Sequence, residues 1–498
     1  GDVYKRQIAH RNGGVFYLRI EDTDEKRKVD GAVETIINVL RYFDIEFDEG
    51  AGFDDTDPRN AYGPYFQRQR VEIYHTYAKS LVERGLAYPC FCTEEELDKV
   101  RAKQEEDKVL TGYYGEYATC RNLSYEEIEA NIKAGKPYVL RLRSQGSPDK
   151  EITFVDAIKG EIKLPENIHD IVLLKKDGIP TYHFAHAIDD HLMRTTTVVR
   201  GGEWLASAPI HYELFHLLGF KMPAYAHTAH LMKFDEETGG KRKLSKRKDP
   251  ELSLDYYRKD GYHPYTMKVY LLTLLNSNFE EWHEKFPDKD INEFPFSVEK
   301  MNQSGALFDK DKLHNICKNE LSKLSEEELY DFLYDWAKEN EPENVEKWFG
   351  DREKMLQILR LYMGVGAKRR RKDLMYAKQI FELISYFFDG ESAEEMDEFK
   401  LDEDMVSKIL KSYLAKYDHN DDNSVWFNKL KEIADEHGFA SDMKAYKANP
   451  ENFKGNVSDI AEAVRIAVTG RANTPDLWTI VHIMGEEQMT ERIKKHIK

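Results

Sequence analysis

The chain has 498 residues, of which 73 are lysine or arginine and 91 are aspartate or glutamate, so its formal net charge is -18. No apolar run approaches the roughly 18 residues of a membrane span, and four cysteines are too few for a disulfide framework. The acidic balance also argues against indiscriminate binding of polyanions. Length alone predicts roughly three to four domains, and we expect a soluble, cytoplasmic protein without a membrane partner.

The first part of the chain, residues 1–86, predicts alternating strands and helices. Residues 15–20 are rich in strand formers, whereas apolar side chains recur at helical spacing in 31–43, and a second helix is predicted at about 68–84. This alternation favours a parallel α/β sheet. Glu21 follows the first strand at the carboxyl end, where open α/β sheets bind ligands, although acidic residues there also serve as helix N-caps.

Residues 87–168 interrupt this pattern with short strands and a charged helix. Segments 138–143 and 151–164 predict a hairpin, and the whole region is expected to be an insertion. The α/β pattern then resumes in residues 169–252.

Three of the four cysteines lie inside the insertion, in a stretch of about thirty residues. Cys90 and Cys92 have C-x-C spacing, and Cys120 follows at a distance. Thiolates in this pattern suit tetrahedral zinc, although a set of small buried thiols is the alternative, and no fourth ligand is evident.

Two motifs in the second α/β part are candidates for a ligand pocket. PTYHFAHAIDDH contains Tyr182 and His186 after a tight turn, although single histidines are more often structural. In VVRGGEW, Arg200 ends a predicted strand, and the two glycines after it allow a ligand to approach the backbone closely. Arginine is a natural bidentate partner for a carboxylate, and Trp204 can supply a stacking wall.

The octapeptide KRKLSKRK, residues 241–248, places six cations in an acidic chain. A solvated basic turn is the simplest interpretation of such a run. However, cations on a loop next to the two motifs also suit a polyphosphate, where they stabilise charge that develops during attack at phosphorus. Neither G-x-x-x-x-G-K-[ST] nor G-x-G-x-x-G occurs, so P-loop and dinucleotide-fingerprint enzymes lose support.

Four motifs in order, RIEDTD, PTYHFAHAIDDH, VVRGGEW and KLSKR, resemble those of the bacterial glutamyl-tRNA synthetases, which are class I aminoacyl-tRNA synthetases. Weaker similarity is found in GPYFQRQR, in FSVEKMNQSGALFDKDKL and in RIAVTGRANTPDLW near the C-terminus. The resemblance runs from about Ile8 to the end of the chain.

The resemblance implies a multidomain protein that combines α/β and all-α parts. A Rossmann-type parallel-sheet catalytic domain carries an α/β insertion and is followed by a helical C-terminal half. The expected divisions are catalytic 1–86 and 169–252, acceptor-stem-binding 87–168, stem-contact 253–325 and anticodon-binding 326–498.

The same resemblance implies a two-step reaction with L-glutamate, ATP, Mg²⁺ and tRNA(Glu), catalysed by a monomer. The glutamate carboxylate attacks the α-phosphate of ATP, pyrophosphate leaves, and the glutamyl group is then esterified to the terminal ribose of the tRNA. Glutamate is expected to contact Glu21, Tyr182, His186, Arg200 and Trp204. The ATP phosphates are expected to contact Lys243 and Lys246, and the tRNA phosphates are expected to contact Arg369, Arg370 and Arg371 of the KRRRK run.

Three features depart from the family pattern. The family begins with an RFAPSPTG-like strand and an HIGH-type motif, which are absent here, so we expect a chain that lacks its true N-terminus and activates glutamate poorly. In addition, His186 replaces a usual Asn and Gly202 a usual Glu.

Other interpretations are less favoured. A non-catalytic tRNA-binding protein derived from a synthetase is the main alternative, whereas a glutaminyl enzyme would end in β-barrels, and a shortened tRNA-base-modifying relative would lack the helical C-terminal part.

Overall fold

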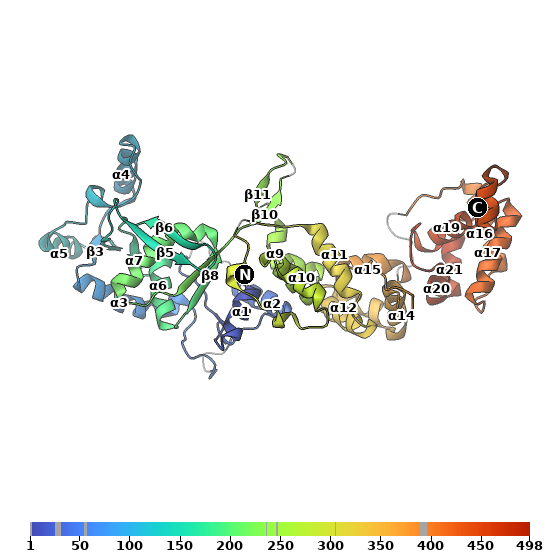
Figure 1. The fold of residues 1–498 in the computed structure, drawn as a ribbon, viewed down its shortest axis with the longest axis horizontal. Coiled ribbons are helices and arrows are strands. Elements are labelled where there is room, and N and C mark those ends of the chain that lie inside the picture. Colours follow the sequence, from blue (N-terminus) through green and yellow to red (C-terminus); the bar gives the residue numbers. More distant parts are fainter. Residues whose placement is uncertain are drawn as a thin grey trace. The chain divides into compact units, whose positions relative to one another are not determined.

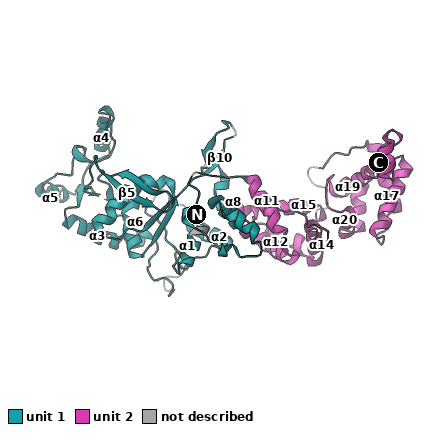
Figure 2. Cartoon of the chain, in the orientation of Figure 1, with its two compact units in different colours: residues 1–255, 268–309 teal, residues 256–267, 310–498 magenta. Residues whose placement is uncertain are grey.

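The described residues of the computed structural model are 2–24, 31–53, 57–235, 237–245, 248–303, 305–388 and 396–498. They form two compact units (Figure 2), of which unit 1 comprises residues 1–255 and 268–309 and unit 2 comprises 256–267 and 310–498. All strands of the described residues lie in unit 1, and unit 2 is helical (Figure 1). The predicted fold class, an α/β part with parallel strands followed by a helical half, is confirmed.

The largest sheet of unit 1 has four strands in the order β6-β5-β9-β8. β8 pairs in parallel with β9, and β9 pairs in parallel with β5, while β5 and β6 form an antiparallel hairpin. The carboxyl ends of three parallel strands therefore meet at one edge. The bounds are β5 Glu151–Asp156, β6 Gly160–Pro165, β8 Thr197–Gly201 and β9 Ala224–Thr228.

Three helices pack into one apolar core in unit 1: α3 (Val71–Glu83), α6 (Tyr182–Leu192) and α7 (Ala208–Leu218). Phe184 and Leu214 are fully buried where α6 and α7 meet, and burying such side chains stabilises the fold by roughly 1.5–3 kcal/mol each. This packing fixes the helix that carries the PTYHFAHAIDDH motif.

A second sheet has the order β3-β4-β7 and is antiparallel throughout. Its strands are β3 (Ala87–Cys90), β4 (Val139–Leu142) and β7 (Val172–Leu174). The predicted hairpin between 138–143 and 151–164 is therefore wrong, because β4 pairs with β3 and β7, and residues 151–165 form a hairpin on their own. Gly160 supplies a left-handed turn residue with φ 76°, which lets the chain reverse inside that segment.

The insertion also contains α4 (Glu94–Glu106) and α5 (Tyr125–Lys133). Each begins with a capping box, in which the Thr93 or Ser124 side chain accepts a hydrogen bond from the backbone N–H three residues later.

The N-terminal region contains α1 (Asp2–Arg11), α2 (Ala32–Tyr42) and a two-stranded parallel pair, β1 (Tyr17–Leu18) with β2 (Glu49–Gly50). The strand predicted at 15–20 is thus shorter than expected. Ile20, just after β1, hydrogen-bonds to the segment before α3 and not to β2, because its N–H donates to the Tyr65 carbonyl.

The basic octapeptide begins inside a strand rather than on a free loop. β10 (Leu231–Phe234) pairs antiparallel with β11 (Lys241–Lys243) and in parallel with β12 (Ala306–Leu307). Three further helices follow or lie between these segments: α8 (Leu254–Asp260), α9 (Pro264–Leu275) and α10 (Phe279–Lys285).

Unit 2 is built around a continuous apolar core to which most of its helices contribute. Side-chain caps such as Ser325, Asp402 and Asp422 begin several of them. None of the described helices has both the length and the apolar character that crossing a membrane requires. The helices are α11 Lys310–Leu321, α12 Glu326–Asn340, α13 Val345–Phe349, α14 Arg352–Met363, α15 Ala377–Ile384, α16 Glu403–Lys416, α17 Asn423–His437, α18 Met443–Ala448, α19 Val457–Thr469, α20 Leu477–Met484 and α21 Glu486–Lys494.

Candidate active site

Arg200 lies at the carboxyl edge of the four-stranded sheet, directly opposite His227 on the neighbouring strand. Its Nε donates a hydrogen bond to His227 Nε2 at 2.9 Å, and its Nη1 donates to His211 Nδ1 at 3.1 Å. Its Nη2 reaches the Trp204 carbonyl at 3.3 Å, and the guanidinium lies 4.8 Å from the Tyr225 ring centroid. Arg200 is thus fixed in direction by four neighbours.

Behind Arg200, His227 contacts Asp156 at the end of β5. The distance from His227 Nδ1 to Asp156 Oδ2 is 2.6 Å, and both side chains are 0% exposed. Burial acts to raise the pKa of Asp156, but hydrogen bonds from His227 and from the backbone amides of Lys159 and Ile158 outweigh it, so the pKa is lowered. Asp156 is therefore a buried carboxylate that keeps its charge.

Three histidines of α6 and α7 form a layer beside Arg200. His183 Nδ1 lies 3.0 Å from His211 Nε2, and the rings of His186 and His211 have centroids 4.5 Å apart. His186 also contacts the Tyr225 hydroxyl at 3.0 Å. Burial lowers the pKa of His183 and of His186 to about 4, and Arg200 adds to the lowering. Burial likewise lowers the pKa of His211, so all three imidazoles are neutral near pH 7.

Tyr182 and Trp204 form an aromatic wall over this layer. Their ring centroids are 4.7 Å apart, and Tyr182 stacks on His186 at 5.5 Å. Burial, with a smaller contribution from Glu21, raises the pKa of Tyr182 to about 12, although Arg200 acts to lower it. Trp204 is 37% exposed, so the wall borders solvent.

Glu21 is held near the same layer through Arg19. Arg19 Nη2 donates to Glu21 Oε1 at 3.3 Å, and its Nη1 donates to Asp190 Oδ1 at 2.9 Å. Asp190 in turn lies 3.3 Å from His186 Nδ1. A chain of contacts therefore links Glu21, on the strand-end segment, to the histidine layer on α6.

The aspartate pair of PTYHFAHAIDDH is structural as well as positioning. Asp189 is fully buried and accepts hydrogen bonds from Gln67, Arg70 and Tyr74 at 3.0, 2.8 and 2.8 Å. These hydrogen bonds connect α6 to α3 and to residues 67–70, which precede α3.

The basic octapeptide uses one of its cations internally. Arg242 makes two hydrogen bonds of 2.7 Å with the buried carboxylate of Asp249. Lys243 is half exposed, and its ammonium group forms a loose ion pair with Glu203 at 3.8 Å that borders solvent. Lys246, the predicted ATP contact, lies outside the described residues.

The three cysteines of the insertion gather as their spacing predicts. The sulfur atoms of Cys90, Cys92 and Cys120 all lie within 4.8 Å of one another, with 3.6 Å between Cys92 and Cys120. Tyr113 directs its hydroxyl into the cluster, 3.4 Å from Cys90 Sγ and 3.3 Å from Cys92 Sγ. All four cysteines of the chain are free thiols.

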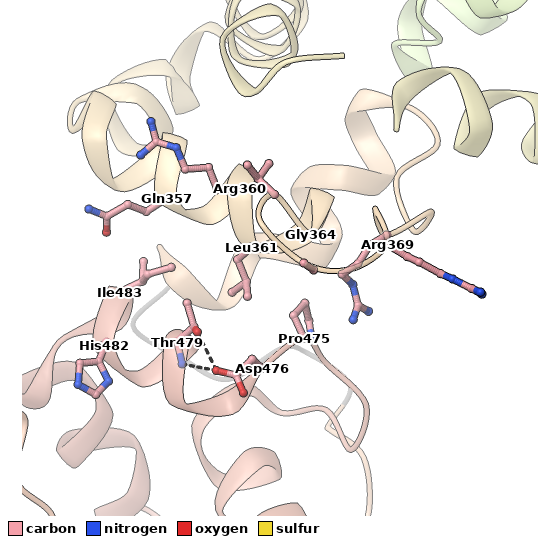
Figure 3. A pocket seen from close by; sticks show the side chains of 13 residues that line it. Gln357, Arg360, Leu361, Gly364, Arg369, Pro475, Asp476, Thr479, His482 and Ile483 are labelled. Carbon is pink, nitrogen blue, oxygen red and sulfur yellow. Dashed lines mark hydrogen bonds between the residues drawn. The ribbon is translucent and has the colours of Figure 1, made fainter. Parts of the chain in front are cut away.

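The KRRRK run lies in unit 2, in the loop after α14 rather than on a helix. A cavity of about 670 Å³ is lined by residues of α14, of this loop and of the start of α20. Figure 3 shows the side chains that line it, with Arg360 of α14, Arg369 of the loop, and Asp476 and Thr479 at the start of α20 among those labelled. Arg371 also lines it but is paired with Asp373, with an Nη2–Oδ2 distance of 2.6 Å. Arg369 and Arg370 are exposed.

The predicted residues Tyr182, His186, Arg200 and Trp204 thus lie together, with Glu21 linked to them, whereas the cysteines and KRRRK form separate sites. Sequence reasoning missed Asp156, His211 and His227, since the pairing of β5, β8 and β9 brings Asp156 and His227 to Arg200 and the packing of α7 brings His211. It also missed Arg19 and Asp190 as the link between Glu21 and the histidine layer.

The chain belongs to the class I tRNA synthetases. The model of the catalytic domain described as "tRNA synthetases class I (E and Q)" matches residues 3–315, and that of an anticodon binding domain matches residues 328–497. Membership of this family implies the use of ATP.

Within the family the similarity is to the glutamate enzymes. A glutamate-tRNA ligase of Acetivibrio thermocellus is 53% identical over 497 residues, covering 99% of this chain and 90% of the relative. One from Clostridium perfringens is 46% identical, with the same coverage. The crystal structure of a glutamate tRNA ligase from Elizabethkingia meningosepticum, in complex with its amino acid, superposes with a TM-score of 0.74 at 27% identity, covering 99% of this chain and 95% of that one.

Proposed function

We propose that the chain is a glutamate-tRNA ligase, which activates L-glutamate with ATP and transfers it to the terminal adenosine of tRNA(Glu) for protein synthesis in the cytoplasm. The observation that carries this proposal is Arg200, a directed guanidinium in a pocket of neutral histidines. No carboxylate among the described residues forms an ion pair with it. Such a cation favours an anionic ligand, and the names of the relatives identify that ligand as glutamate.

In this proposal the two ends of glutamate meet opposite charges. Its side-chain carboxylate pairs with Arg200 and the Tyr182 hydroxyl, and its ammonium group pairs with Glu21. Trp204 covers the aliphatic part, and His186 borders the pocket as a neutral imidazole. Glutamine would leave the Arg200 charge unpaired, which is how a site built for a charged ligand rejects the uncharged analogue.

The reaction then follows from the charges around the two carboxylates of glutamate. With the side chain held by Arg200, the α-carboxylate is the group left free to attack the α-phosphate of ATP, and pyrophosphate leaves with the β- and γ-phosphates. Lys243 and Lys246 would meet the negative charge on the phosphates as it grows. Mg²⁺ would arrive with ATP, bound by its phosphates.

A structural zinc ion is a second part of the proposal. Tetrahedral zinc with thiolate bonds of about 2.3 Å requires sulfur atoms about 3.8 Å apart. Cys90, Cys92 and Cys120 come close to that spacing, with all three sulfur atoms within 4.8 Å of one another. The three thiols therefore fit zinc, which would join the segment at Cys90 and Cys92 to the segment at Cys120.

Recognition of tRNA(Glu) by a monomer is assigned to the parts outside the pocket. We propose that residues 87–168, apart from β5 and β6, which belong to the sheet that carries Arg200, meet the acceptor stem, 253–325 the stem and 326–498 the anticodon region. Arg369, Arg370 and Arg371 would contact phosphates, which positions the RNA without reading its sequence.

The test is glutamate-dependent charging of tRNA(Glu) by the purified protein, with glutamine as the control amino acid. Binding of tRNA without formation of glutamyl-tRNA would favour the alternative, a non-catalytic tRNA-binding protein. Within an active enzyme, Lys246→Ala should slow adenylate formation while leaving tRNA affinity nearly constant. Equal loss of both would mean that the basic loop mainly binds RNA.

A further inference from the structure

We propose that Asp156 and His227 are positioning residues for Arg200, and that they orient its guanidinium through one protonation state of the His227 ring. This inference rests on the proposed role of Arg200 in holding the substrate carboxylate. Asp156, His227 and Arg200 come from three different strands, and the parallel pairing of β5, β9 and β8 places their side chains at one edge.

The hydrogen-bond partners determine where the His227 proton lies. An arginine Nε–H only donates, so His227 Nε2, at 2.9 Å from it, must accept. The proton of the neutral ring is therefore on Nδ1, which donates to Asp156 Oδ2 at 2.6 Å. Asp156 fixes this tautomer because its carboxylate can only accept.

The other side of Arg200 follows the same rule. His211 Nδ1 accepts from the guanidinium at 3.1 Å, so its proton is on Nε2 and points to His183 Nδ1 at 3.0 Å. Two neutral imidazoles thus hold Arg200 with acceptor nitrogens. A carboxylate in their place would orient the guanidinium equally well but would also neutralise its charge. The His227 ring separates the Asp156 carboxylate from the guanidinium.

The consequence is specificity for a charged side chain. A guanidinium oriented by neutral acceptors keeps its full attraction for a substrate carboxylate. A guanidinium already paired with a protein carboxylate would bind a carboxamide almost as readily as a carboxylate. Asp156 and His227 therefore act on glutamate through Arg200, without contact with ATP.

Two isosteric variants separate positioning from simple packing. In His227→Gln the side-chain oxygen takes the place of Nε2 and still accepts from Arg200. In His227→Asn the amide takes the place of Nδ1, so the contact to Asp156 is kept and the acceptor for Arg200 is lost. Both variants remove a buried ring, so damage to packing should be similar.

Asp156→Asn tests the tautomer itself. Asp156 Oδ1 accepts from the Ile158 and Lys159 amides at 2.9 Å, so an asparagine oxygen is expected to stay there. Its NH₂ group would then take the place of Oδ2, which loses the hydrogen bond that Oδ2 accepts from the His227 backbone N–H at 3.0 Å, and would face Nδ1 of the ring. The ring proton would shift to Nε2, which would place two donors against each other at Arg200.

The experiment is charging of tRNA(Glu) by the full chain, with KM measured separately for glutamate and ATP. Positioning predicts that KM for glutamate rises about tenfold or more in His227→Asn relative to His227→Gln, with KM for ATP changed by less than about threefold in both. Asp156→Asn should raise KM for glutamate and narrow the preference for glutamate over glutamine. Equal effects of the two His227 variants, or parallel rises in both KM values, would overturn the proposal in favour of a structural role.

A second measurement does not depend on activity. Imidazole nitrogen NMR of the unmodified chain, with His227 assigned by its loss in His227→Asn, should show an unprotonated Nε2, and Asp156→Asn should reverse this. A protonated Nε2 in the unmodified chain would overturn the inference whatever the enzyme does. Failure of the unmodified chain to charge tRNA with glutamate, with the tautomer as expected, would count against the proposed function alone.

Discussion

Arginines serve two different purposes in the two units of this protein. In unit 1, Arg200 is held from three sides by His227, His211 and the Trp204 carbonyl, beside a layer of neutral imidazoles. In unit 2, Arg369 and Arg370 are exposed on a loop, and Arg369 lines a wide cavity.

The difference follows from the ligand that each region is proposed to meet. A small amino acid offers few contacts, so a directed guanidinium with little solvent screening is needed to tell one carboxylate from a carboxamide. An RNA backbone offers repeated charges, so exposed cations suffice and their contribution depends on salt. Orientation should therefore matter in unit 1, and charge alone in unit 2.

Arg200→Ala should show the largest effect. Removing one partner of a buried charged pair costs about 2–5 kcal/mol, so kcat/KM for glutamate should fall by roughly a thousandfold. Steady-state charging kinetics measure this, with the exposed Arg84→Ala as control. A loss of less than tenfold would mean that Arg200 does not bind the substrate.

His186→Asn should change the response of stability to acid. The pKa of His186 is about 4 in the folded protein and about 6.5 unfolded, so between these values the unfolded chain binds a proton that the folded chain does not. Stability is therefore lost as pH falls from about 6.5 to 4, by at most about 3 kcal/mol for this group. Urea unfolding at pH 7.5 and 4.5 should show a smaller acid loss in the variant.

The exposed His216 on α7 gives the matched control for that experiment. His216→Asn should leave the acid loss close to that of the unmodified chain. An unchanged pH response in His186→Asn would contradict the burial of a neutral His186.

Cys92→Ser tests the sulfur cluster of unit 1. Zinc that binds only the folded protein stabilises it by about 2.7 kcal/mol at 100 times its dissociation constant. The variant should lose bound zinc and that increment of thermal stability, as measured by metal analysis and by unfolding with and without zinc. Cys317→Ser should keep the metal, and zinc retained in Cys92→Ser would refute the site.

Arg369→Gln and Arg370→Gln should show a small effect, a loss of about 1 kcal/mol or less each in the free energy of tRNA binding. The slope of log affinity against log salt concentration should become shallower by about the amount of one phosphate contact in each variant. Titrations of tRNA(Glu) at several salt concentrations measure both quantities. Arg371→Gln should have a smaller effect than either, because Asp373 already pairs with that guanidinium. Equal effects of all three would mean that the loop contributes charge only as a whole.

Much of the pocket could be predicted from local sequence. Arg200 and Trp204 follow a strand-forming run and a glycine pair, and Tyr182 and His186 share one face of a helix one turn apart, so their neighbourhood follows from short-range geometry. The C-x-C spacing likewise predicts that Cys90 and Cys92 lie close together, whereas Cys120 reaches them only after the chain has passed through α4.

The predictions that were wrong concern strand pairing. Residues 138–143 and 151–164 both have strand character, but no local signal says that the first pairs with β3 and β7 while the second folds on itself and joins β9. Pairing between distant strands is decided by the packing of the whole sheet.

The sequence by itself determined the family, the two-part architecture and the side chains that carry charge in the pocket, because motifs and periodicity are properties of neighbouring residues. Only the tertiary structure decided how Arg200 is held. Asp156, His211 and His227 are separated from it along the chain, and their contacts exist because β5, β9 and β8 end at one edge beside α7. Hydrogen-bond direction, and with it the proton on His227, follows from that assembly.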